Sequence, residues 1–202
     1  MRRQHIIMVL LVLVSTHAFS ATSTPSVYKT TVTKVELCSS SACSDPIVLG
    51  SGSKEFDIAS VSAQADVGTY LNDFTITLGR TYTHVRSTIN ATMTTKGTVD
   101  VSGTTCNTVA SPTVAAASHT ATAKTAPSGT LAEMDWVVPN VNGGGDYANL
   151  TQRYNANGIS KTDGASTFTF TVAIVSPYTP KASDTPKVSI KFHVADTLAA
   201  TT

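Results

Sequence analysis

The stretch TYTHVRSTINATMTT, residues 81–95, decides the fold class, because its apolar and polar side chains alternate with a period of two. The two faces carry different residues: Val85, Ile89, Ala91 and Met93 on one, and His84, Arg86, Thr88 and Asn90 on the other. Such alternation is typical of a strand with one face on a core and the other in solvent. Tyr82, at the strand entrance, is expected to bond its hydroxyl to nearby backbone.

Similar segments recur on both sides of this stretch. The further expected strands cover residues 27–38, 46–49, 55–58, 74–78, 98–101, 131–138, 167–175 and 187–195. GSGS between 46–49 and 55–58 predicts a hairpin of these two segments, and a return of 98–101 against the preceding strand is expected. A short helix is expected around Leu150 after Asp146, while residues 60–71 form either a short helix or a crossing loop. The sequence therefore predicts an all-β fold, an antiparallel β-sandwich of about seven to nine strands with one or two short helices.

The amino-terminal segment has the pattern of an export signal. Arg2 and Arg3 precede the apolar run 6–14, and Ala18-Phe19-Ser20 provides a small-residue cleavage site. We expect residues 1–20 to be a signal peptide and the mature chain to begin at Ala21. The run is too short for a permanent transmembrane helix, so the processed chain is expected not to span a membrane. The expected location is secreted, on the cell surface or in the periplasm.

Composition restricts the classes of partner. The chain has 14 basic and 13 acidic residues, and only 13% of its residues are charged. No basic face is available for a phosphate backbone, so nucleic acid is excluded as an expected partner.

Residues 21–202 are expected to form a single domain, in which the Ala/Thr/Ser-rich segment 111–130 is a low-complexity connector or an edge strand.

Three cysteines are compatible with an oxidising compartment. Cys38 and Cys43 flank the small-residue loop SSSA, which favours a disulfide between them. Cys106 is then buried, bonded to another molecule, or paired with one of the other two.

No catalytic or metal constellation is expected. The G-x-S-x-G nucleophile context is absent, and His84, His119 and His193 are scattered along the chain. The cysteine pair lacks the histidines of a zinc site. The sequence predicts a protein that is not an enzyme and that uses no cofactor.

Oxygen-bearing side chains occur in two patterns that resemble functional sites. The carboxylate pairs Glu55 with Asp57 and Glu133 with Asp135 are expected on solvated strand faces. Asn140, Asn142 and Asp146 surround a glycine loop, but one carboxylate is too little charge for tight calcium binding.

Aromatic residues near expected loops offer a platform for a sugar or another ligand. Trp136, Tyr147 and Tyr154 are the tentative ligand-binding residues, with Tyr178 near a further loop. The alternative is that Trp136, which alternates with Met134 and Val138, belongs to the core.

Three short segments carry a resemblance to a known class. These are Val35-Glu36-Leu37, FDIAS at 56–60 and LGRTYTHVR at 78–86. They resemble uncharacterised secreted bacterial β-sandwich (prealbumin-like) surface proteins. The resemblance implies a surface or periplasmic role and supplies no catalytic residues. Because no lipobox cysteine follows Ser20, no lipid anchor is expected.

The expected function is that of a secreted or cell-surface structural protein, a filament or matrix subunit that self-associates or binds other surface proteins. The extended segment 21–27 has little to bury and is suited to add a strand to a neighbour's sheet edge. The alternative function is an extracellular module that binds carbohydrate or another ligand.

Overall fold

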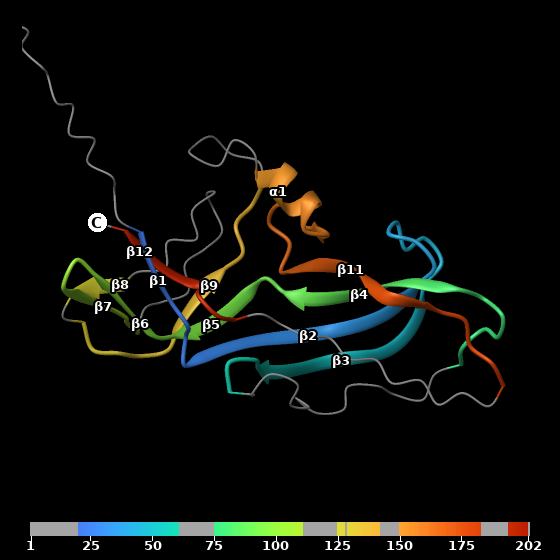
Figure 1. Ribbon diagram of the computed structural model, residues 1–202, viewed down its shortest axis with the longest axis horizontal. Helices are drawn as coiled ribbons and strands as arrows, with labels where there is room; N and C mark the ends of the chain where they lie inside the picture. Colours follow the sequence, from blue (N-terminus) through green and yellow to red (C-terminus); the bar gives the residue numbers. More distant parts are fainter. Residues whose placement is uncertain are drawn as a thin grey trace, which may run out of the picture.

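A computed structural model of the chain describes residues 20–60, 75–110, 125–127, 129–141, 150–182 and 194–201 (Figure 1). The described strands form three antiparallel sheets, and α1 (Leu150–Ala156) is the one helix among the described residues. The all-β class is therefore confirmed, whereas a sandwich of two facing sheets stays a prediction. The expectations for 187–195 and for most of 60–71 lie outside the described residues. No helix in these ranges is long and apolar enough to cross a membrane.

The main sheet has seven strands. They are β2 (Val27–Cys38), β3 (Ile47–Asp57), β4 (Tyr82–Asn90), β5 (Thr92–Lys96), β9 (Met134–Val137), β10 (Ile159–Ser160) and β11 (Thr167–Tyr178). β3 pairs with β2, and β4 and β5 also pair with β2; β11 then pairs with β4, and β9 with β5. The long strands β2, β3, β4 and β11 run side by side (Figure 1).

The predicted strand 81–95 is divided at Ala91. The backbone N–H of Ala91 donates to the carbonyl of Ser166 at 2.8 Å, and its own carbonyl accepts the N–H of Val138 at 2.8 Å. The backbone of Ala91 therefore bonds to the segment before β11 on one side and to the residue after β9 on the other. At this residue β4, which pairs with β11, ends, and β5, which pairs with β9, begins. The apolar face is confirmed: Val85, Ile89 and Ala91 are buried, and Met93 packs against them.

Two small sheets lie at the other end of the molecule, on the left in Figure 1. One contains β6 (Thr98–Val101), β7 (Thr104–Thr108) and β8 (Thr125–Pro127); the other pairs β1 (Ser20–Ser23) with β12 (Leu198–Thr201). The expected return of 98–101 onto the preceding strand is wrong, because β6 pairs with β7 through the two-residue turn Ser102-Gly103. Both turn residues have positive φ, 50° and 83°, as a type I′ hairpin requires. β8 is the only described strand within the low-complexity segment 111–130, and it is an edge strand.

The apolar residues form two clusters. The main cluster contains the buried residues Val32, Val35, Leu37, Leu49, Tyr82, Val85, Ile89, Ala91, Val138 and Phe168. The second cluster contains Val99, Val101 and Leu198, with Ala21 and Cys106 partly buried against them. The two small sheets therefore share the second cluster, to which β6, β12, β1 and β7 all contribute.

A bulge changes the burial pattern of β2. Its register against β4 shifts between Val32 and Lys34, so that Val32 and Val35 are both buried although they are three positions apart. An unbroken alternation over the expected strand 27–38 would place Val32 and Val35 on opposite faces, so the period of two fails at this point.

The predicted hairpin over 46–58 is also wrong. These residues belong mainly to the single strand β3, and the hairpin partner of β3 is β2. Register shifts allow the GSGS segment to remain in the ladder, with Gly52 at a φ of 108°. The pairing with a long neighbour has overridden the local turn signal.

The entrance to β4 differs from expectation as well. The described residues 75–78 form no strand and lead into a turn at Gly79, whose φ is 72°. Tyr82 is fully buried, but its hydroxyl has no hydrogen-bond partner among the described residues, so the expected bond to backbone is not formed there. The guanidinium carbon of Arg80 instead lies 5.3 Å from the centre of the Tyr82 ring.

Candidate functional site

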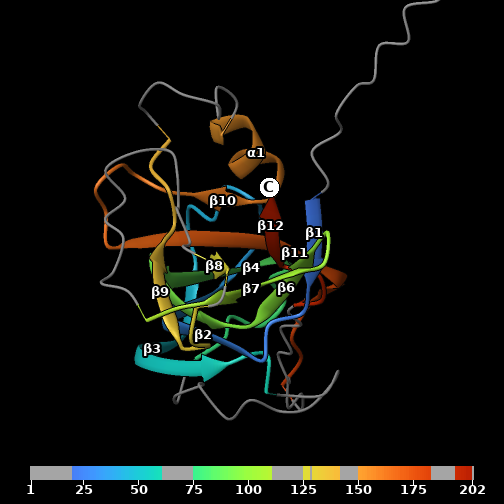
Figure 2. The same cartoon turned by 90° about the vertical axis from the view of Figure 1, so that its left-hand side faces the viewer.

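The strongest candidate for a functional surface is the pairing of β1 with β12, which we call the terminal seam. Four residue pairs align the two strands, from Ser20 with Thr201 to Ser23 with Leu198. Figures 1 and 2 show both strands side by side, next to β6. The segment 21–27 was expected to be extended with little to bury. Within this chain, its first three residues instead pair with β12 in the seam.

Gly97 lies close to Leu198 of β12 and to Pro25, which follows β1. A Cβ atom on Gly97 would lie 2.9 Å from Cδ2 of Leu198 and 3.1 Å from Cα of Pro25. Ser23 adds a hydrogen bond from its hydroxyl to the carbonyl of Thr98. A larger residue where β5 passes into β6 would require the Leu198 side chain to turn and the backbone at Pro25 to shift by a few tenths of an ångström.

β1 itself is weakly anchored. Its one apolar contact with the second cluster is Ala21, whose burial contributes no more than about 1 kcal/mol. The chain is fixed again at Ser26, whose backbone N–H donates to the carbonyl of Lys96 at 2.7 Å. Among the described strands, β1 pairs with β12 and with no strand of the main sheet.

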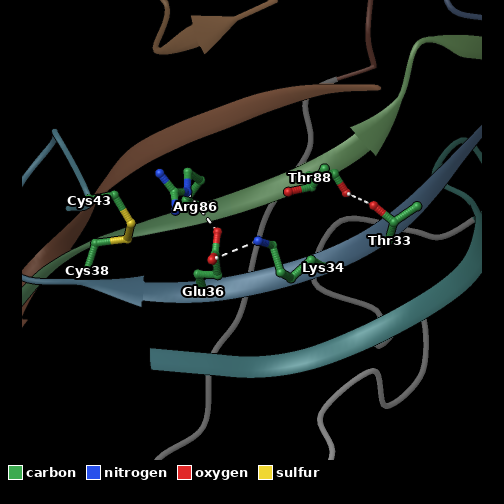
Figure 3. A network of polar contacts seen from close by, with 7 residues as sticks. All are labelled: Thr33, Lys34, Glu36, Cys38, Cys43, Arg86 and Thr88. Atoms are coloured by element: carbon green, nitrogen blue, oxygen red, sulfur yellow. Dashed lines mark hydrogen bonds and ion pairs between the residues drawn. A yellow bond between two sulfur atoms is a disulfide. The ribbon is translucent and has the colours of Figure 1, made fainter. Parts of the chain in front are cut away.

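The main sheet carries a second candidate, a buried ion cluster (Figure 3). Glu36 on β2 lies directly opposite Arg86 on β4, and its carboxylate accepts a hydrogen bond from Nε of Arg86 at 2.7 Å. Nζ of Lys34 lies 3.0 Å from the other carboxylate oxygen. The Glu36 side chain is only 3% exposed. Burial by itself raises the pKa of Glu36, but the hydrogen bonds from Arg86 and Lys34 outweigh it and hold the pKa below its ordinary value of 4.5.

The Glu36 cluster makes stability dependent on pH. Because the folded-state pKa is lowered, the stabilisation is fully present above pH 4.5 and is lost as the pH falls toward the lowered pKa. We expect the wild type to lose more unfolding free energy than Glu36→Gln between pH 7 and pH 3, as measured by urea denaturation. Parallel curves for the two proteins would contradict this prediction.

The tentative ligand-binding residues Trp136 and Tyr154 both pack against the main cluster with partly buried rings. The Tyr154 hydroxyl donates to the carbonyl of Pro139 at 3.1 Å. Burial and the charge of Asp163 raise the pKa of Tyr154 to about 12, which keeps this donor protonated. The core interpretation of Trp136 therefore accounts for its contacts, while a ligand-binding role stays a prediction. Tyr147 lies outside the described residues.

Three of the four paired carboxylates have partners in the fold. Glu133 forms an ion pair with Lys29 at 2.7 Å. Asp135 accepts the hydroxyl of Thr94 at 2.5 Å, and Asp57 accepts the backbone N–H of Tyr28 at 3.0 Å. The contacts of Asp135 and Asp57 join neighbouring strands, β9 with β5 and β3 with β2, which is a structural role that the sequence pattern alone did not reveal.

Two further expectations concern metal ligands and histidines. In the ranges that the structure describes, no group of three or more His, Cys, Asp and Glu side chains could hold a metal ion. The Asn140 side-chain oxygen accepts a hydrogen bond from Nζ of Lys161 at 2.7 Å, so one of the oxygens beside the glycine loop already has a partner within the chain. His84 contacts Thr83 through Nδ1 at 2.8 Å. Asn142, Asp146, His119 and His193 lie outside the described residues.

The disulfide between Cys38 and Cys43 is confirmed, with their Cα atoms 4.9 Å apart. It lies in the connection between β2 and β3, where Arg80 donates to the Asp45 carboxylate at 2.7 Å. Cys106 is half-buried and unpaired in the second cluster. The alternatives that pair Cys106 with either of the other cysteines are therefore wrong.

No family model, curated protein or solved structure matches this chain.

Proposed function

We propose that this protein is a secreted or cell-surface assembly subunit whose copies exchange strand β1 at the terminal seam. The observation that carries the proposal is the seam itself: a short strand with small side chains pairs with β12 and touches the second cluster through Ala21 alone. The export pattern of residues 1–20 and the disulfide are compatible with a role outside the cytoplasm.

Exchange requires little free energy because a second copy offers the same β1. In a mature chain that begins at Ala21, the three pairs from Ala21 with Ala200 to Ser23 with Leu198, and the contact of Ala21, would re-form between two chains with no new chemistry. The connector 24–26 would act as the hinge, since its far end is fixed by the two hydrogen bonds from Ser26 to the Lys96 carbonyl. Reciprocal exchange gives a closed dimer, and sequential exchange gives a filament.

Paired cysteines at the seam distinguish exchange from a closed chain. Thr22 and Ala199 are register partners, so Thr22→Cys with Ala199→Cys should form a disulfide wherever β1 pairs with β12. Cys106→Ser in the same background removes the unpaired thiol. After oxidation at high protein concentration, we expect covalent dimers and larger species on a non-reducing denaturing gel.

A matched control uses a pair that cannot exchange easily. Asp100 and Thr105 are register partners across the two-residue turn of the β6–β7 hairpin, and cysteines there should give cross-linked monomers only. Deleting residues 21–26 should abolish association of the otherwise unmodified protein. Cross-linked monomers from the seam variant at every concentration would overturn exchange as the mode of assembly.

A further inference from the structure

A lysine and an asparagine from separate segments meet beside α1. Asn140 follows β9, and Lys161 follows β10. Nζ of Lys161 lies 2.7 Å from Oδ1 of Asn140, and the backbone N–H of Gly164 donates to the same oxygen at 3.0 Å. The backbone N–H of Gly164 therefore orients the Asn140 amide, and the Lys161 amine lies against the same amide oxygen.

The Lys161 amine is removed from water, since the residue is only 8% exposed. Burial lowers the pKa of Lys161 and prevails over the opposing effect of the nearby Asp163 carboxylate, which favours the neutral, nucleophilic amine. Asp163 is held close to Asn140 as well: its Oδ1 accepts the backbone N–H of the adjacent Val141 at 2.6 Å.

From this arrangement we infer that Lys161 and Asn140 become joined by an isopeptide bond that the protein forms by itself. The Nζ atom of the neutral amine attacks Cγ of Asn140, and the carbonyl electron pair moves onto Oδ1. When the carbonyl re-forms, the Cγ–Nδ2 bond breaks and Nδ2 leaves as ammonia, having gained the proton that Nζ loses. The products are one secondary amide and one ammonia molecule, so no oxidant or co-reactant is required.

Two neighbours have defined roles in this reaction. The N–H of Gly164 stabilises the negative charge that develops on Oδ1. Gly164 has a φ of 75° in the turn closed by the hydrogen bond from Ala165 to Thr162, and this conformation favours glycine. Asp163 is placed to carry the proton from Nζ to Nδ2, because it follows Lys161 by two positions and its Oδ1 accepts the backbone N–H of Val141, next to Asn140.

The bond would fasten the end of β9 to the connection between β10 and β11. The loop that it closes contains α1, so the helix would be held covalently between two parts of the main sheet. Such a cross-link suits an extracellular protein exposed to force or proteases, but its formation is independent of strand exchange.

Mass spectrometry of the intact protein tests the inference directly. Loss of ammonia lowers the mass of the reduced protein by about 17 Da. Trypsin should then release the peptides 125–153 and 154–181 as one linked species that is not cleaved after Lys161. A tandem spectrum placing the link between Asn140 and Lys161 is the expected result, and it requires no variant to fold.

Variants assign the chemistry to these side chains. Lys161→Arg and Asn140→Ala should each restore the full mass, and Asp163→Asn should slow the loss at least about tenfold. Lys54→Arg, a matched change on β3, should keep the loss. Asn157-Gly158 can lose the same mass by forming a succinimide, but that product would persist in Lys161→Arg and yield no linked peptide. Full mass in the wild type, or a loss that survives Lys161→Arg without linked peptides, would overturn the inference.

Discussion

Replacing Arg86 by Ala is expected to lower the free energy of unfolding by about 3–5 kcal/mol, because it leaves the buried carboxylate of Glu36 without its closest partner. Lys34 remains, but its side chain is 40% exposed and contacts the second oxygen at 3.0 Å. A cation exposed to that extent is screened by solvent and cannot replace the guanidinium. Urea denaturation at pH 7, followed by the fluorescence of the single tryptophan, measures the loss.

A double variant that lacks both charges tests whether the loss in Arg86→Ala comes from the unpaired buried carboxylate. Glu36→Leu combined with Arg86→Leu removes both charges, so the double variant should recover most of the stability that Arg86→Ala loses. Lys34→Ala is the matched control at the same carboxylate, and it should cost no more than about 1 kcal/mol. Equal losses from Arg86→Ala and Lys34→Ala would show that Glu36 does not depend on the buried partner.

The strands that the sequence predicts best are those whose signal is local. The boundaries of β2 agree with the expected 27–38, and β11 contains all of 167–175. Alternation needs only neighbouring residues, because a pleated strand places successive side chains on opposite faces. The same rule identified the buried face of β4.

Alternation along the sequence does not predict features that depend on a strand far away in the chain. The bulge after Val32 and the break at Ala91 reflect the register of other strands, and the GSGS segment stays extended because β2 lies beside it. β1 and β12, with the sequences SATS and LAAT, have too few apolar residues to show any periodicity. They become strands because residues far apart in sequence meet beside Gly97.

The candidate functional contacts differ in the same way, because some are local in sequence and others join separate segments. Cys38 and Cys43 are close in sequence, and their disulfide was predicted from that spacing. The burial of Glu36 and the contact of Lys161 with Asn140 depend on separate segments. Lys161 occurs in a polar stretch with no distinguishing motif, so only the folded chain reveals it.

The second large effect is expected at Gly158, which joins the end of α1 to β10. Its φ of 71° lies in the left-handed region, and its N–H donates to the carbonyl of Asn155 at 3.1 Å as the helix ends. Its carbonyl accepts the N–H of Thr171 at 2.8 Å. A Cβ atom at this position would lie 2.0 Å from the carbonyl oxygen of Thr171, so the backbone of β11 would have to move.

Gly158→Ala should therefore lower the free energy of unfolding by about 3 kcal/mol or more, since it adds a backbone clash to the strain of a positive φ. Gly103→Ala isolates the strain, because Gly103 has a φ of 83° and no atom within 4 Å of its added Cβ. That control should lose about 1 kcal/mol. Urea denaturation of both variants makes the comparison, and equal losses would mean that the contact with Thr171 relaxes without cost. A larger loss at Gly158 would instead show that the close approach of its backbone to β11 determines how α1 is held to the main sheet.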